Sequence, residues 1–207
     1  MEEKMQSGSD RRDFLKKSAL FGLGLAAAGN LVLPATARAA GMATGAESHD
    51  LGILNFALNA EHQAIAAYQV GAESKLLKPG ALKLALQFQK DHEAHAAILA
   101  ETIQKMGGKP VAAKLPLTAP MGELAKAWGF PVAQLKDEAD VLHFAAGLEI
   151  GAAKAYLGAV KDFRTPELAH AAANIEGDEA MHYAILRNAL GMNPVPAAFI
   201  SAMPDKA

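Results

Sequence analysis

Glutamate and histidine residues interrupt four otherwise apolar helical patterns. Across residues 50–190, apolar side chains recur at spacings of three and four, which is typical of helices that face a core. Near the middle of these patterns a carboxylate or an imidazole replaces the apolar side chain, at Glu61, His92, His95, Glu149, Glu179 and His182. A buried carboxylate is costly unless it is paired or binds a metal ion. The sequence therefore predicts that these six residues form one buried metal site.

The spacing within two of the patterns suits metal binding. His92 and His95 are three residues apart, as are Glu179 and His182. Residues at this spacing lie on one face of a helix and can bind the same ion. The alternative interpretation is a hydrogen-bonded cluster of buried polar residues that binds no metal.

An internal repeat places the helices in pairs. Residues 53–61 (ILNFALNAE) resemble residues 141–149 (VLHFAAGLE), and residues 91–99 (DHEAHAAIL) resemble residues 178–186 (DEAMHYAIL). The matches continue to Tyr68 and Tyr156, which we expect to be core residues. Two matches in the same order indicate a duplicated helical hairpin.

The chain is therefore expected to be all-α. Helices are predicted over residues 50–73, 79–106, 135–162 and 166–190. Ser48 or Asp50 is expected to cap the first helix, and Thr165 the last. The connections within each hairpin are short, whereas residues 107–133 form a long connection that contains four prolines. This pattern predicts a four-helix bundle made of two repeated hairpins with one crossover between the second and third helices.

These motifs resemble those of the ferritin-like superfamily. A Glu from each of two helices and a Glu-x-x-His from each of the other two form the carboxylate-bridged di-iron signature of that superfamily. Glu61, Glu149, His95 and the pair Glu179 and His182 match it, and residues 178–182 (DEAMH) resemble the Asp-Glu-x-x-His segment of rubrerythrin-like proteins. The resemblance covers about residues 50–190 and implies a ferritin-like fold with two metal ions, iron or manganese. It also implies that Asp178 orients a histidine ligand.

His92 departs from this signature, because the resemblance predicts a bridging carboxylate at its position. The three Glu carry three negative charges, one fewer than the four positive charges of two divalent ions. Asp91, Asp178 or solvent could supply it, or a π-bulge could turn Glu93 inward. A single ion, zinc or an empty site are the remaining alternatives. On this basis His92→Glu is expected to tighten binding of a second ion, and Glu149→Gln to stabilise the metal-free fold by relieving a like-charge cluster.

The first 39 residues resemble an export signal. Arg11 and Arg12 precede an apolar stretch over residues 19–33, and residues 37–39 (ARA) offer a small-x-small cleavage site. Residues 1–39 are predicted to be a twin-arginine-type signal peptide, and residues 40–207 the ferritin-like domain. The alternative is an uncleaved membrane anchor. Cleavage implies a periplasmic or secreted protein with no stable membrane span.

Composition limits the classes of function that the chain can have. The net charge of −2 gives no indication of a nucleic-acid partner, and the absence of cysteine excludes disulfides and iron–sulfur centres. With the resemblance, these observations favour an oxidoreductase or ferroxidase that acts on oxygen, peroxide or iron(II). The alternative is a non-catalytic periplasmic metal-binding or stress-protection protein, similar to the ferritin-like proteins described as desiccation-related, with a partial or empty site. A homodimer is a further expectation.

Overall fold

All secondary structure in the described part of the chain is helical. The computed structural model describes residues 45–205, and the predicted signal peptide and cleavage site lie outside them. Four long helices span these residues: α2 (Gly45–Glu73), α3 (Pro79–Lys105), α5 (Glu138–Val160) and α6 (Pro166–Ala189). No strand occurs within residues 45–205, which confirms the all-α prediction.

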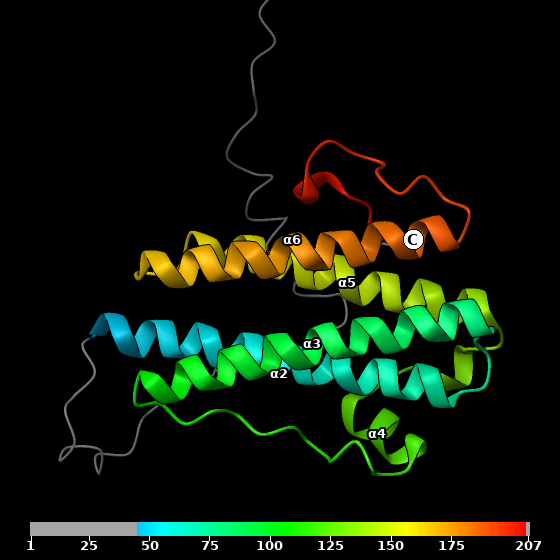
Figure 1. Cartoon of the computed structure of the whole chain (residues 1–207), viewed down its shortest axis with the longest axis horizontal. Coiled ribbons are helices and arrows are strands. Elements are labelled where there is room, and N and C mark those ends of the chain that lie inside the picture. The colour runs from blue at the N-terminus through cyan, green and yellow to red at the C-terminus, as the bar shows by residue number, and fades with distance from the viewer. Residues whose placement is uncertain (1–44, 206–207) are drawn as a thin grey trace, which may run out of the picture. The chain divides into compact units, whose positions relative to one another are not determined.

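The long helices pack as two hairpins. Helices α2 and α3 contact each other along their lengths, as do α5 and α6, and α2 also contacts α5 while α3 contacts α6. Figure 1 shows the α2–α3 pair lying against the α5–α6 pair, with the crossover running along the outside of the first hairpin. Within residues 45–205 this is the predicted four-helix bundle.

The crossover contains a short helix within the long connection predicted over residues 107–133. Helix α4 (Met121–Trp128) has two turns and ends at Gly129, whose φ of 73° suits a residue without a Cβ atom. Leu124 and Trp128 are buried against α2. The crossover thus covers an outer face of α2 that would otherwise expose apolar side chains.

Two helix boundaries differ from the prediction. Helix α2 begins at Gly45, so Asp50 lies inside it, and the Asp50 carboxylate accepts hydrogen bonds from the backbone N–H groups of Arg164 and Thr165, each at 3.0 Å. Helix α5 begins at Glu138, because the carboxylate of Asp137 caps it by accepting a hydrogen bond from Asp140 N at 3.0 Å. The predicted cap residue Asp50 therefore ties the two hairpins together.

The C-terminal segment returns along the second hairpin. Tyr183 Oη donates a hydrogen bond to the Pro204 carbonyl at 2.8 Å, and Lys154 Nζ donates one to the Met203 carbonyl at 2.7 Å. The Met203 side chain is buried beside Tyr183 and Ile150. These contacts pin the segment to α5 and α6.

Two apolar clusters enclose a polar layer at the middle of the bundle. One contains Leu54, Leu58, Leu99, Ile103 and Ile175, and the other contains Tyr68, Phe88, Ile150, Tyr183 and Leu186. Along α3 and α6, the Glu and His side chains of the polar layer lie between members of the two clusters. Among residues 45–205, no helix is both long and apolar enough to span a membrane.

Candidate metal centre

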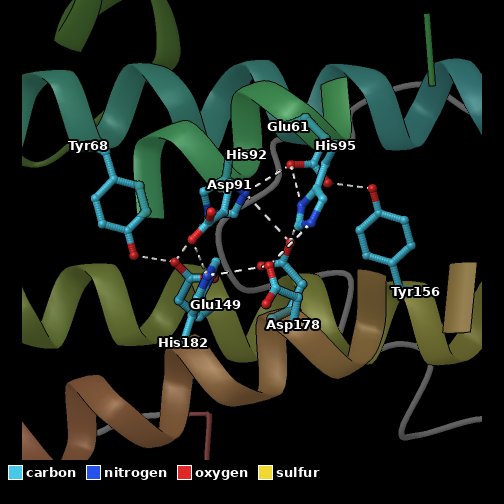
Figure 2. Close-up of polar contacts among 10 residues, drawn as sticks. Glu61, Tyr68, Asp91, His92, His95, Glu149, Tyr156, Asp178 and His182 are labelled. Carbon is cyan, nitrogen blue, oxygen red and sulfur yellow. Dashed lines mark hydrogen bonds and ion pairs between the residues drawn. The ribbon is translucent and has the colours of Figure 1, made fainter. Parts of the chain in front are cut away.

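All six predicted site residues lie in the polar layer. Helix α2 contributes Glu61, α3 contributes His92 and His95, α5 contributes Glu149, and α6 contributes Glu179 and His182. Five of them are 2% exposed or less, and the His95 side chain is 14% exposed. Figure 2 shows the labelled members of this set converging from the two hairpins. The sequence placed them on inward faces, and the packing of the hairpins brings them into contact.

The first group of candidate ligands comprises Glu61, His92, His95 and Glu179. His92 Nδ1 lies 2.8 Å from Glu61 Oε2 and 3.5 Å from Glu179 Oε1. His95 Nδ1 lies 3.6 Å from Glu61 Oε2 and 3.3 Å from Glu179 Oε1. Ligands about 2.0–2.2 Å from one ion lie roughly 3 to 3.5 Å from each other, so these separations suit a transition metal.

The second group comprises His92, Glu149, Glu179 and His182. His92 Nε2 lies 3.2 Å from Glu149 Oε1, and His182 Nδ1 lies 3.4 Å from Glu149 Oε2. The His182 ring stacks on Phe88 with a centroid separation of 3.9 Å, which holds its orientation. His92 and Glu179 belong to both groups, so the two groups share two residues.

Several atoms of the layer make no hydrogen bond, although they are fully buried. Among the described residues these are His95 Nδ1, Glu149 Oε2, both carboxylate oxygens of Glu179, and His182 Nδ1. Buried polar atoms are normally satisfied, so a concentration of unpaired ones requires an explanation. All of them are nitrogen or oxygen atoms with lone pairs that a divalent cation accepts. The residues therefore fit a metal centre.

Two aspartates at the edge of the layer contact the histidines. His95 Nε2 lies 3.2 Å from Asp178 Oδ2, and His182 Nε2 lies 3.3 Å from Asp91 Oδ2. In each case the aspartate faces the nitrogen remote from the cluster, so Nδ1 remains directed at the candidate ion. Such a contact selects the tautomer and orients the ring. The resemblance implied this role for Asp178, whereas the role of Asp91 emerges only from the structure.

Two tyrosines bind the glutamates across the hairpins. Tyr68 of α2 donates a hydrogen bond to Glu149 of α5, and Tyr156 of α5 donates one to Glu61 of α2. Figure 2 shows the two phenols on opposite sides of the cluster. Both tyrosines are buried, as the sequence predicts, and the recurrence of Tyr seven residues after each Glu is the sequence signal for their contacts.

Burial and mutual charge set the ionisation of the cluster. Burial disfavours ionisation of Glu149, but the His92 charge and the close contacts of His182 and His92 outweigh it, so the pKa of Glu149 falls well below its usual value. Burial and the Glu149 charge raise the pKa of Glu179 well above its usual value. Burial opposes protonation of His92, yet the Glu149 charge and the hydrogen bonds to Glu149 and Glu61 raise its pKa well above the ordinary value. Protons therefore supply positive charge to the metal-free cluster.

The alternative in which a π-bulge turns Glu93 toward the metal site is wrong. Glu93 is exposed, and α3 is a regular α-helix with no π-bulge, so this carboxylate points away from the cluster. Asp91 and Asp178 approach only the outer nitrogens of His182 and His95. Within the described residues, His92 itself occupies the position opposite Glu179.

Comparisons with known proteins agree with this architecture. A conserved hypothetical protein, rv2844, from Mycobacterium tuberculosis has a similar crystal structure, with a TM-score of 0.57 and 24% sequence identity. The similarity covers 73% of this chain and 97% of that chain, and at this identity it shows the fold alone. Comparison with curated proteins gave no match. The family described as ferritin-like domain matches residues 49–192, and over this majority of its length the chain belongs to that family.

Proposed function

We propose that the polar layer binds two divalent metal ions, iron or manganese. The observation that carries this proposal is a set of buried nitrogen and oxygen atoms that make no hydrogen bond. They come from three of the four long helices and belong to two overlapping groups of candidate ligands. Each group offers two nitrogen and two oxygen ligands. This mixed donor set suits iron and also admits zinc or manganese.

Glu61 and His95 would hold one ion, Glu149 and His182 the other, and His92 and Glu179 belong to both groups. Bound iron or manganese would supply redox chemistry with oxygen, peroxide or iron(II). Asp178 and Asp91 orient His95 and His182, and the apolar clusters on both sides of the layer exclude water. The chain's own contribution is a largely buried ligand set whose histidines are held in orientation.

Cations would reach the polar layer from solvent by passing between α3 and α6. The side chains of Asp91 and Asp178 are 38% and 30% exposed, and both contact His182, while Asp178 also contacts His95. Carboxylates at this edge attract cations from solvent. Metal would thus reach the buried ligands past these two aspartates.

A second candidate function is a non-catalytic metal-binding or stress-protection role. The observation that favours it is His92, which stands where the resemblance implies a bridging carboxylate. Oxygen or peroxide consumption by iron-loaded protein distinguishes the two functions. Catalytic turnover supports the oxidoreductase, and stable binding without turnover supports the second function.

We also propose export by the twin-arginine route, on the basis of Arg11, Arg12 and the small-x-small segment. The test replaces both arginines with lysine and follows the cellular location of the protein. Retention in the cytoplasm is expected. Unchanged export of the double variant would contradict the twin-arginine assignment.

Metal analysis of protein purified from its native compartment tests the central proposal. Two ions per chain are expected, and the metal-loaded chain should melt at a higher temperature than the chelated one. At a free metal concentration 100 times the dissociation constant, binding adds about 2.7 kcal/mol to the free energy of unfolding. His182→Ala should lose most of this gain, whereas the exposed His143→Ala on α5 should keep it. Absence of bound metal, with identical melting of chelated and metal-treated protein, would refute the proposal.

A further inference from the structure

His92 presents a different ring nitrogen to each group of ligands. Its Nδ1 faces Glu61 Oε2 at 2.8 Å and Glu179 Oε1 at 3.5 Å, while its Nε2 faces Glu149 Oε1 at 3.2 Å. Figure 2 shows the ring lying between the carboxylates of the two hairpins. The ring thus spans the space between the two groups.

Packing holds the ring in this orientation. His92 is 1% exposed, and its ring centroid lies 5.5 Å from that of Tyr68 and 5.4 Å from that of His182. The His95 ring stands edge-on to it at 5.9 Å. By contrast, the Nε2 atoms of His95 and His182 face Asp178 and Asp91 at the edge of the layer. Those two histidines therefore offer one nitrogen to the cluster, and His92 offers two.

We propose that His92 bridges the two metal positions, binding one ion through Nδ1 and the other through Nε2, as an imidazolate. This inference rests on the proposed binding of two ions. It assigns to an imidazole ring the place that the resemblance gave to a carboxylate.

Charge balance supports the bridge. Glu61, Glu149 and Glu179 carry three negative charges when ionised, against four positive charges on two divalent ions. An imidazolate supplies the fourth negative charge, and an uncompensated charge in this apolar surrounding would be costly. Asp91 and Asp178 are partly exposed and contact the histidines rather than the cluster interior, so solvent screens them more.

Formation of the bridge displaces two protons from the His92 ring. In the metal-free chain both nitrogens of His92 lie within hydrogen-bond distance of carboxylate oxygens, and because an ionised carboxylate only accepts, each of these contacts uses an N–H group of the ring. Each ion therefore replaces one N–H bond with one metal–nitrogen bond, and each displaced proton leaves to solvent. No oxidant or reductant is required.

The bridge has a measurable consequence. Metal–nitrogen bonds of about 2.0–2.1 Å on the two sides of a five-membered ring place the ions roughly 6 Å apart. Two-metal sites with a short bridge have a spacing of about 3.5–4 Å. Cobalt(II) is a suitable probe, because it accepts the same nitrogen and oxygen ligands as iron(II) and zinc(II).

Anomalous diffraction from crystals of the cobalt(II)-loaded full chain measures the spacing directly. Two peaks roughly 6 Å apart on opposite sides of the His92 ring are expected from the geometry of the bridge. Two peaks about 4 Å apart, or one peak alone, would overturn the bridge but leave metal binding intact. No peak in the polar layer, with no cobalt bound in solution, would overturn both the bridge and the proposed function.

Variants of His92 give an independent test. His92→Gln should bind one cobalt ion tightly and lose at least 10-fold in affinity for the second, because an amide cannot bridge as an anion. His92→Glu should bind two ions at the shorter spacing of about 4 Å. The control is Glu93→Gln, since Glu93 is the next residue on α3 and is exposed; it should bind as the wild type does. Two ions at wild-type spacing in His92→Gln would overturn the bridge, and if that variant fails to fold, the wild-type spacing still decides.

Discussion

His95 Nε2 lies 3.2 Å from Asp178 Oδ2, so a candidate ligand on the first hairpin is oriented by a carboxylate on the second. The relationship is reciprocated, because His182 Nε2 of the second hairpin lies 3.3 Å from Asp91 Oδ2 of the first. Each aspartate directly precedes a candidate ligand on its own helix. Ligand orientation therefore depends on the correct docking of the hairpins.

Asp178→Asn is expected to weaken metal binding by roughly 10- to 100-fold, since an amide neither fixes the histidine tautomer nor raises the basicity of the ring to the same degree. Calorimetric titration of the chelated protein measures the loss. Asp162→Asn is the matched control, because the Asp162 side chain is exposed and forms an ion pair with the exposed Lys161. Equal affinities of the two variants would show that Asp178 does not position His95.

Tyr68→Phe and Tyr156→Phe are each expected to lower the free energy of unfolding by about 1 to 3 kcal/mol, because each removes a hydrogen bond to a buried, charged carboxylate. The internal repeat makes the two contacts equivalent, so the two losses should be similar. Urea unfolding of chelated protein gives both values. A loss in only one variant would show that the two halves of the layer are not equivalent in energy.

The metal-free cluster should distinguish Glu149 from Glu179. Glu149→Gln is expected to lower the free energy of unfolding by about 1 to 3 kcal/mol, since it removes the carboxylate that faces His92 Nε2 and leaves the buried His92 charge with Glu61 as its close partner. This reverses the expectation from sequence, because the pKa of Glu149 is lowered rather than raised. Glu179→Gln should change stability by less than about 1 kcal/mol, because the raised pKa of Glu179 keeps it protonated and an amide replaces a neutral group. Urea unfolding in the presence of a chelator checks both, and a greater loss in Glu179→Gln would contradict the assignment.

Metal-free and metal-loaded protein should respond oppositely to pH. The folded-state pKa of His92 lies well above its ordinary value of 6.5, so its contribution is complete below that pH and is lost as pH rises through the raised pKa. Chelated wild type should therefore lose more stability than chelated His92→Gln as the pH rises above about 6.5. Metal binding displaces protons, so metal-loaded protein should gain stability over the same interval. Thermal melting in matched buffers measures both, and parallel curves for wild type and His92→Gln would exclude His92 as the source.

The sequence alone identified the candidate ligands and the helices that hold them. Periods of three and four place Glu61, Glu149 and the Glu179–His182 pair on inward faces, because an α-helix with 3.6 residues per turn aligns such positions. The internal repeat then indicated two hairpins, which the structure confirms within residues 45–205. Helix periodicity and local repetition are properties of short segments, so no tertiary information was needed.

Only the tertiary structure decided how these residues face one another. Tyr68 reaches Glu149 across 81 residues, and Asp91 reaches His182 across 91 residues. Nothing in either local segment specifies these pairs, since they depend on the register and rotation with which one hairpin docks on the other. The same docking leaves Glu93 in solvent and places His92 between three carboxylates. His92 departs from the family signature, and its buried ring offers one nitrogen to each of the two ligand groups.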